Sequence, residues 1–436
     1  MTKIYLTYFS FCLRLCLIVF LSASAVNTQA LQLDPTFDSD GKQTIGFGES
    51  GLRSSYAYYV LGQPSGRLVV YGSHNIGGQS GTYGIATAAL TAAGALDAGF
   101  GTGGRILEMS DTVNVRAVES LPNGQSLRLL SVFTLSFPST SSAVLHRLNV
   151  NGSADGLFVA NLNVNADVIP LAMSTRSDGK ILILLSGVGV DRSHWLVRLN
   201  ANGSRDTSFG TNGVASLNLL RLGSFAPAGV HMLADDRVLI GGYGSTTGGP
   251  QGGSVAWAVL VDKKGHLDRR FGLQGVYRQR FPYGIRVSKT QLQPDGKIVL
   301  IGHAYPDGFS HLMLIRLTTR GRGDTGFGTN GISIAPTIGP GSFDVAHSGK
   351  LMSDGRIIIA GSYALTQFDR SEFLVARFSS SGVFESHAVT QFTPGFDTVA
   401  HDVFIQSDGK PVVVGYTRNP DTSADGNLFA IARYTQ

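Results

Sequence analysis

Two histidines and one aspartate have the residue types and the spacing for shared chemistry. His347 and His401 each stand seven residues before the aspartate of a recurring Asp-Gly turn, Asp354 and Asp408 respectively. We therefore expect the two histidines at equivalent places on neighbouring strands, with Asp402 directly after one of them. Two imidazoles close together can bind a metal ion or transfer protons, as a hydrolase or lyase working at a channel mouth requires.

A packing role explains the same histidines, and we favour it because buried histidines also fill space with satisfied hydrogen bonds. His347, His401 and Asp402 therefore stay candidates for catalysis, and we expect neither a metal ion nor a cofactor. The corresponding positions of the other copies hold unrelated side chains, namely Tyr58, Arg116, Leu171, Ala228 and Ser288.

The turn that sets these spacings recurs seven times along the chain. Asp-Gly between two apolar runs is a hairpin signal, because glycine adopts positive φ at low cost and the aspartate side chain bonds within its own turn. Successive copies are 58, 55, 57, 60, 59 and 54 residues apart. Such a period suits one four-stranded blade of a β-propeller. The third turn residues are Gly66, Gly124, Gly179, Asp236, Gly296, Gly355 and Gly409.

The repetition itself argues that the Asp-Gly-Lys turns are structural. A catalytic group is needed once, whereas a hairpin turn is needed in every blade. The segment Asp38-Ser39-Asp40-Gly41 begins like a calcium-binding loop, but the glutamate that such a loop requires further on is absent from the required place. We therefore expect turns and no calcium site at these positions.

A second segment keeps the same period and completes each repeat. It reads Arg-Leu-Asn-x-x-Gly followed by Asp-Thr-Ser-Phe-Gly in its fullest copy, Arg198 to Gly210. We expect its phenylalanine to fill the space between neighbouring blades, where a large ring buries about 150–250 Å². Three copies depart from the pattern: the second lacks Phe-Gly after Asp155, the fourth has Asp236 for glycine, and the sixth ends Val383-Phe384-Glu385.

The two ends of the chain are complementary parts of one repeat. The last unit contains three expected strands, Val399 to Gln406, Pro411 to Tyr416 and Leu428 to Tyr434. The missing parts stand near the beginning, where Leu33 to Phe37 reproduces the Asp-to-Phe segment and Gly41 to Phe47 the strand after it. Pairing these ends closes a ring and removes a long exposed edge. The expected fold is all-β, a seven-bladed β-propeller of four-stranded blades whose N-terminal strand completes the last blade.

These segments resemble the delta-60 repeat, a bacterial propeller-type repeat with the same order of turn, apolar strand, Arg-Leu-Asn-x-x-Gly and Asp-Thr-Ser-Phe-Gly. The resemblance covers essentially all of Leu33 to Gln436. It implies export and a propeller fold. It implies no catalytic residue, because the family carries no agreed activity.

The first thirty residues have the composition of a secretory signal peptide. Lys3 and Arg14 precede the apolar run Leu15 to Leu21, and small residues follow up to Ala25. The run is shorter than the about 20 residues that span a bilayer, so we expect cleavage after Ala25 or Ala30 and no membrane span afterwards. The expected organisation is a signal peptide over residues 1–30 and the propeller over residues 31–436, in a secreted or periplasmic monomer.

Composition narrows the classes of function. Both cysteines, Cys12 and Cys16, fall in the signal peptide, so the cleaved chain has no disulfide and no cysteine nucleophile. Without Lys3 and Arg14, 33 basic residues stand against 30 acidic ones, a charge of +3 that does not favour nucleic acid. We expect a non-enzymatic binding or scaffold module that takes a protein or glycan partner through its loops, including Gly242 to Ser254 and Thr417 to Gly426. The alternative is a hydrolase or lyase at the channel mouth.

Overall fold

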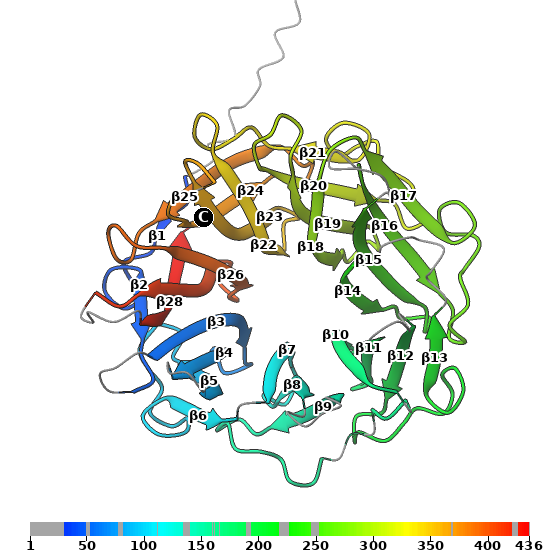
Figure 1. Ribbon diagram of the computed structural model, residues 1–436, viewed down its shortest axis with the longest axis horizontal. Helices are drawn as coiled ribbons and strands as arrows, with labels where there is room; N and C mark the ends of the chain where they lie inside the picture. Colours follow the sequence, from blue (N-terminus) through cyan, green and yellow to red (C-terminus); the bar gives the residue numbers. More distant parts are fainter. Residues whose placement is uncertain are drawn as a thin grey trace, which may run out of the picture.

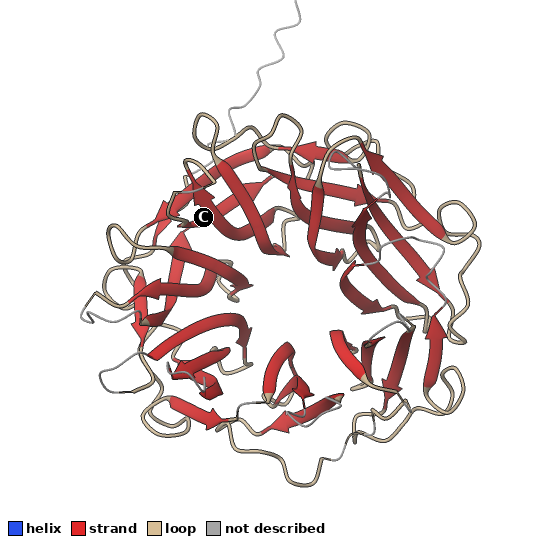
Figure 2. Cartoon of the chain, viewed as in Figure 1, coloured by secondary structure: helices blue, strands red, loops and turns tan. Residues whose placement is uncertain are grey.

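The computed structural model contains strands and turns, with no helix among the residues that it describes (Figure 2). The described residues are 30–48, 53–76, 82–110, 112–133, 140–158, 160, 162–164, 166–188, 193–217, 226–245, 253–367, 369–420 and 426–435. The expected signal peptide, with both cysteines, lies outside this described part except for Ala30.

Seven antiparallel sheets stand in a ring around a central axis, so the protein is a seven-bladed β-propeller (Figure 1). Each blade begins with its innermost strand and proceeds outward in chain order. The blades are blade 1, β3 (Arg53–Gly62), β4 (Leu68–Ile76), β5 (Thr82–Leu90) and β6 (Arg105–Met109); blade 2, β7 (Val113–Ser120), β8 (Ser126–Phe133) and β9 (Ser141–Leu148); blade 3, β10 (Val168–Thr175), β11 (Ile181–Gly187), β12 (His194–Leu199) and β13 (Val214–Leu217); blade 4, β14 (Ala226–Met232), β15 (Val238–Ser245), β16 (Ser254–Val261) and β17 (Val276–Phe281); blade 5, β18 (Ile285–Leu292), β19 (Ile298–Ala304), β20 (His311–Leu317) and β21 (Ile332–Ile334); blade 6, β22 (Phe343–Leu351), β23 (Ile357–Ala364), β24 (Glu372–Phe378) and β25 (Phe384–Thr390); and blade 7, β26 (Thr398–Ile405), β27 (Pro411–Arg418) and β28 (Asn427–Thr435) with the N-terminal β1 (Gln32–Leu33) and β2 (Lys42–Ile45).

Blade 7 confirms the predicted closure of the ring by the two chain ends. β2 pairs antiparallel with β28, with Lys42 opposite Ala432 and Ile45 opposite Phe429. β1 pairs with the other end of the same strand. The side chain of Ile45 is fully buried in one hydrophobic cluster with residues of β27, β28 and blade 1. The N-terminal segment is therefore part of the core of the last blade, and it removes the exposed edge that β28 would otherwise present.

The Asp-Gly turns link the inner strand of each blade to the second strand, as the sequence predicts. Gly179 adopts a φ of +83°, and the Lys180 N–H donates to Asp178 Oδ1 at 3.2 Å. In blade 4 the position of the glycine is held by Asp236, which adopts the same left-handed conformation with a φ of +68°. The departure from the repeat thus preserves the turn, because aspartate tolerates this region better than most residues.

The phenylalanine of each Asp-to-Phe turn packs between neighbouring blades, as expected. Phe327 of blade 5 is fully buried and lies against Gly382 of blade 6, where an added Cβ would come within 2.7 Å of the ring. The following Gly328 donates its N–H to Ser381 O of blade 6 at 2.9 Å. The same backbone bond recurs at other junctions, from Asp38 to Ala93, Gly101 to Asn151, Gly210 to Lys263 and Gly272 to Arg320.

An ion-pair cluster lies beneath each of these turns and explains the charged residues of the repeat. In blade 3, Arg198 Nε and Lys180 Nζ donate to the same oxygen of Asp206, at 2.8 and 2.6 Å, and the Arg198 guanidinium lies 4.7 Å from the centre of the Phe209 ring. In blade 6, where the aspartate is missing, Glu385 takes its place opposite Arg377 at 2.9 Å. The repeated charges therefore have a structural role beneath the turns.

Blade 2 keeps this core although its repeat is degraded. Phe158 is buried, and the Arg147 guanidinium lies 4.5 Å from the centre of its ring. Arg147 Nε donates to Asp155 at 2.8 Å. The described residues of this blade form three strands, and none is assigned in the outermost position. The loss of the Phe-Gly pair therefore coincides with the lack of an assigned outer strand among the described residues of this blade, while the cluster that supports the turn is retained.

Acid should destabilise the fold in two stages. Burial lowers the pKa of His231, His303 and His347 to about 4, so the unfolded chain takes up protons below about pH 6.5 that the folded chain resists. Burial alone would raise the pKa of Asp206, but hydrogen bonds from Lys180 and Ser208 hold it far below its ordinary value. Its stabilisation is present above about pH 4 and is lost as the pH falls towards the folded-state pKa.

We therefore expect the melting temperature to be constant from pH 8 to about pH 6.5, to fall towards pH 4 and to fall more steeply below it. Thermal melts followed by circular dichroism across this range measure the effect. When His231 and His303 are replaced by glutamine, the melting temperature should fall less between pH 6.5 and 4. The steeper fall below pH 4 should remain. A melting temperature that stays constant down to pH 3 would contradict the assignment.

Candidate functional site

The central channel is the cavity in which side chains of all seven blades meet. It has a volume of about 570 Å³ and is lined by the inner strands β3, β7, β10, β14, β18, β22 and β26 (Figure 1). Its lining includes histidines, lysines, tyrosines, a glutamate and an aspartate. Convergence of polar groups on one enclosed site distinguishes this channel from a packed propeller axis.

Every inner strand carries one β-bulge, and all seven bulges fall at the same place in the repeat. In β22 the register shifts between Ala346 and Ser348, and in β26 between Ala400 and Asp402. The residue inside each bulge is left without an opposite partner and borders the channel. The bulged residues are Tyr58, Arg116, Leu171, Ala228, Ser288, His347 and His401. These are the positions that the spacing of the turns aligns.

The structure brings His347 and His401 together. Their ring centres are 5.3 Å apart, and His401 also lies 5.0 Å from Tyr58 and 5.7 Å from Tyr416. His347 Nε2 is 3.4 Å from Ser362 Oγ of β23. Imidazole and phenol rings from blades 6, 7 and 1 therefore form one aromatic cluster, of which His347, His401 and Tyr58 line the channel. We call these four rings, His347, His401, Tyr58 and Tyr416, the aromatic cluster.

Both histidines are neutral at physiological pH. Burial, assisted by the positive charge of Arg286, lowers the pKa of His347 to about 4. Burial and the neighbouring His347 lower the pKa of His401 to about 3. Each imidazole then has one N–H donor and one acceptor nitrogen, so the pair can bind hydroxyl groups and can also accept a proton.

Asp402 does not orient either imidazole through any hydrogen bond of the described residues. Its carboxylate accepts from Ser348 Oγ of blade 6 at 2.7 Å and from the Val60 N–H of blade 1 at 3.2 Å. The side chain therefore joins three consecutive blades at the channel wall. Its position next to His401 in the sequence suggested shared chemistry, whereas its contacts are those of a residue that positions strands.

A second group of channel residues lies about three positions further along the inner strands, roughly 10 Å at the usual rise. Lys350 of β22, Glu119 of β7 and His231 of β14 occupy equivalent places five residues before the third turn residue. Lys289 of β18 stands nearer the bulges, one residue after its own, but it lines the same cavity and its charge acts on Lys350 and His231. We call Lys289, Lys350, Glu119 and His231 the charged layer. The sequence analysis missed it.

The charges of this layer act on one another across the channel. Burial lowers the pKa of Lys350, and the charge of Lys289 lowers it further. Burial raises the pKa of Glu119, against the opposing influence of Lys350 and Lys289. No ion pair of the described residues includes Lys289, Lys350 or Glu119. The layer therefore holds opposite charges that face one cavity without contact between them.

The strand topology gives the channel two different ends. The Asp-Gly turns follow the inner strands, so the charged layer lies towards the face of these turns. The connections between second and third strands lie on the other face, which includes the expected recognition segments Gly242 to Ser254 and Thr417 to Gly426. Within them, residues 246–252 and 421–425 are outside the described part.

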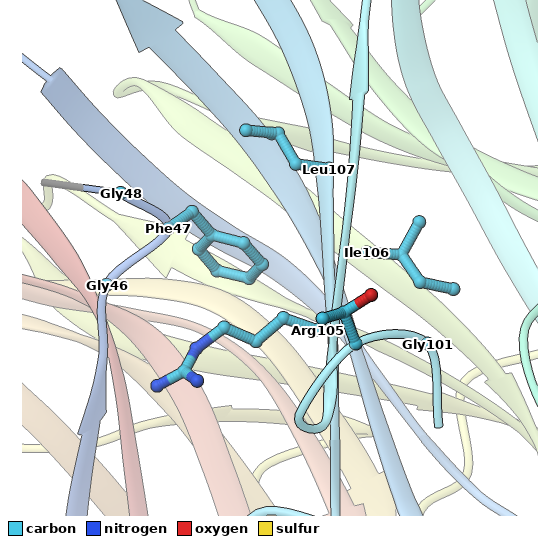
Figure 3. A pocket seen from close by; sticks show the side chains of 8 residues that line it. Gly46, Phe47, Gly48, Gly101, Arg105, Ile106 and Leu107 are labelled. Atoms are coloured by element: carbon cyan, nitrogen blue, oxygen red, sulfur yellow. The ribbon is translucent and has the colours of Figure 1, made fainter. Parts of the chain in front are cut away.

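A hollow of about 520 Å³ at the rim is of a different kind. It lies between the end of β2 and strand β6 and is lined by Gly46, Phe47, Arg105, Ile106 and Leu107 (Figure 3). The Phe47 ring packs edge-on against Phe429 at 4.8 Å. This hollow marks the seam between blade 7 and blade 1 and gathers few polar side chains, so the channel is the better candidate site.

Two further observations concern the described residues as a set. They contain no group of three or more His, Cys, Asp and Glu side chains placed to hold a metal ion. No helix among them has the length and hydropathy to cross a membrane.

Comparison with known proteins supports the repeat architecture. Residues 176–209, 293–327 and 353–386 match a family model described as a domain of unknown function (DUF5122) beta-propeller. These segments lie in blades 3, 5 and 6 and cover less than half of the chain. Curated protein sequences give no match.

The solved structures to which the chain is similar at low identity include the following three. A hypothetical protein from Leishmania major is 12% identical over 64% of this chain and 89% of its own, with a TM-score of 0.30. Polysaccharide lyase Uly1 is 10% identical over 86% and 89%, with a TM-score of 0.47. The mannose phosphorylase MPT-4 from Leishmania mexicana is 12% identical over 63% and 86%, with a TM-score of 0.30. Similarity at this level carries no information about activity. By its sheets the chain is a seven-bladed β-propeller, and segments of blades 3, 5 and 6 match a β-propeller family model.

Proposed function

We propose that the protein is an exported, non-enzymatic binding module that takes a small polar ligand of the glycan class in its central channel. The observation that carries the proposal is the convergence of polar side chains from all seven inner strands on a cavity of about 570 Å³. A cavity of this size is within the usual range of about 300–1,000 Å³ for small-molecule sites. We further propose that the repeats are of the delta-60 type, and that the propeller acts in the periplasm or outside the cell.

The aromatic cluster and the charged layer supply the two kinds of contact that a sugar requires. Tyrosine and imidazole rings offer flat apolar faces for packing together with polar atoms. The neutral imidazoles add one donor and one acceptor each, because burial holds the pKa of both His347 and His401 far below 7. The aromatic rings can pack against the C–H faces of a sugar. The charged groups in another part of the channel can bind its hydroxyl groups.

Blocking the channel tests the proposal. The purified protein is incubated with a panel of neutral and acidic mono- and disaccharides, and ligand binding is measured as a rise in melting temperature and by calorimetry. Ala228 lines the cavity from its bulge in β14, so Ala228→Phe fills the channel without removing a polar group. We expect binding by the wild type, loss of at least tenfold in affinity with Ala228→Phe, and no change with Ala98→Phe at an exposed turn. Binding that survives Ala228→Phe would contradict a channel site.

The second candidate function is a hydrolase or lyase, and the approach of His347 to His401 at 5.3 Å favours it. A neutral imidazole can act as a general base, although the Asp402 carboxylate accepts its hydrogen bonds from Ser348 Oγ and the Val60 N–H and not from either histidine. Product formation from the ligands found in the panel, abolished by His401→Gln with binding retained, would establish the enzyme. Binding without turnover in both wild type and variant would support the binding module.

A further inference from the structure

The charged layer contains two ammonium groups for which the described residues provide no direct counterion. Lys289 and Lys350 stand on the adjacent inner strands β18 and β22 and line the same cavity. Neither takes part in an ion pair with a described residue, whereas many other buried or half-buried cations of the propeller do, for example Arg198 with Asp206 at 2.8 Å. A lysine kept in a cavity without a counterion is costly unless something else supplies the negative charge.

Opposite charges nearby set the charge that a ligand should carry. Glu119 faces the two lysines from blade 2, and the charge of Asp402 also reaches Lys350. The charged residues that line the cavity are three cations, Arg116, Lys289 and Lys350, and two carboxylates, Glu119 and Asp402, so one positive charge remains for a monoanion to neutralise. A doubly charged anion would add repulsion from both carboxylates. The layer therefore favours a single carboxylate over a phosphate dianion.

Glu119 also indicates what should stand beside that carboxylate. An ionised glutamate accepts hydrogen bonds and donates none, so its partners on a ligand are hydroxyl or amine groups. On β14, His231 donates its Nε2–H to Thr290 O at 2.7 Å, and this bond fixes the imidazole at the wall of the same layer. The ligand that fits these groups carries an acid function and hydroxyl donors within a few ångströms of each other.

We propose that the charged layer binds the carboxylate of a small hydroxylated acid of the sugar-acid class. Lys289 and Lys350 hold the carboxylate, and Glu119 accepts hydrogen bonds from the adjacent hydroxyl groups. The inference rests on the proposed function, because it places the acidic end of the glycan-class ligand in the same channel. It adds the chemical class of the ligand and the residues that select it.

Galacturonate and galactose are the matched probes, because they differ only in the carboxylate that replaces a hydroxymethyl group. Calorimetry at moderate ionic strength should show galacturonate binding at least tenfold more tightly than galactose. Removal of one charged hydrogen-bonding partner typically lowers affinity about 10- to 100-fold. We therefore expect Lys289→Met or Lys350→Met to lower galacturonate affinity by that factor and to leave galactose nearly unchanged.

Four controls make the experiment decisive. Lys264→Met removes an exposed lysine from a surface turn and should leave both affinities unchanged. Lys350→Arg keeps the charge and should retain galacturonate binding within a few-fold. Melting curves of every variant verify folding before affinity is compared. Inorganic phosphate, added at the same concentration as galacturonate, should not compete with it.

The outcomes separate this inference from the proposed function. Equal affinities for galactose and galacturonate, both insensitive to the lysine variants but lost with Ala228→Phe, would overturn the acid assignment and leave a channel site for neutral ligands. Competition by phosphate on equal terms would show an unselective anion site and would also overturn it. Absence of galacturonate binding at millimolar concentration would overturn it as well, whereas the proposed function falls when the whole panel fails to bind or when binding survives Ala228→Phe.

Discussion

Asp34→Ala should destabilise the propeller by about 3–5 kcal/mol, because it leaves a buried arginine without its counterion. Asp34 belongs to the N-terminal segment and is 2% exposed. Its Oδ2 lies 2.8 Å from Arg433 Nε and 2.7 Å from Lys410 Nζ, both of blade 7. The same carboxylate accepts from the Thr36 N–H and hydroxyl. One side chain thus joins the beginning of the chain to its end, and urea-induced unfolding measures its contribution.

Two variants distinguish this pairing from a general effect of the N-terminal segment. Asp40→Ala removes an exposed aspartate that lies 3.8 Å from Lys42, and it should cost less than about 1 kcal/mol. In the double variant Asp34→Ala, Arg433→Met, the unpaired charge is gone, so part of the lost stability should return. A single variant as stable as the wild type, or a double variant less stable than Asp34→Ala alone, would contradict the closure role.

Phe327→Ala should cost about 3–5 kcal/mol, as expected for a large aromatic ring removed from a core. The ring is 0% exposed, lies 4.3 Å from the Arg316 guanidinium carbon and fills the space against Gly382 of the next blade. The variant loses buried area at an inter-blade junction, and Arg316 loses the aromatic face beneath it. Equilibrium denaturation at neutral pH gives the free energy of unfolding.

The matched control for this variant is Leu273→Ala. Leu273 stands two residues after the equivalent Phe271 of blade 4, and it is 83% exposed. We expect a change within about 0.5 kcal/mol for this surface substitution. A cost below about 1 kcal/mol for Phe327→Ala would show that blades do not depend on the ring for their packing, which would remove the reason given for its recurrence in the repeat.

The architecture could be predicted because each repeated residue has a local physical role that spacing reveals. The Asp-Gly turns, the phenylalanine of the following turn and the complementary ends all lie where they were expected. The second blade was less predictable, because its sequence after Asp155 departs from the repeated pattern and cannot be aligned with the other copies. In blade 4, the turn persists with Asp236 at a positive φ, so a missing glycine did not mean a missing turn.

The candidate site was predictable only where residues share a position in the repeat. His347 and His401 align by their distance from the turn, and the structure places their rings in proximity. The contacts of Asp402 could not be predicted, because nearness in sequence to His401 does not show which groups donate hydrogen bonds to a carboxylate. Lys289 and Lys350 were not predicted to line the channel. A bulge shifts the alternation of side chains along a strand by one residue, and the sequence does not reveal where a bulge occurs.

The uniform bulge has a consequence for how such a protein acquires new specificity. At that position the backbone accepts tyrosine, arginine, leucine, alanine, serine or histidine without a change of register elsewhere in the blade. Duplication or exchange of a single repeat therefore installs one new lining group and leaves the scaffold intact. Evolution, or a protein engineer, can thus change the side chain at each of the seven wall positions almost independently of the others.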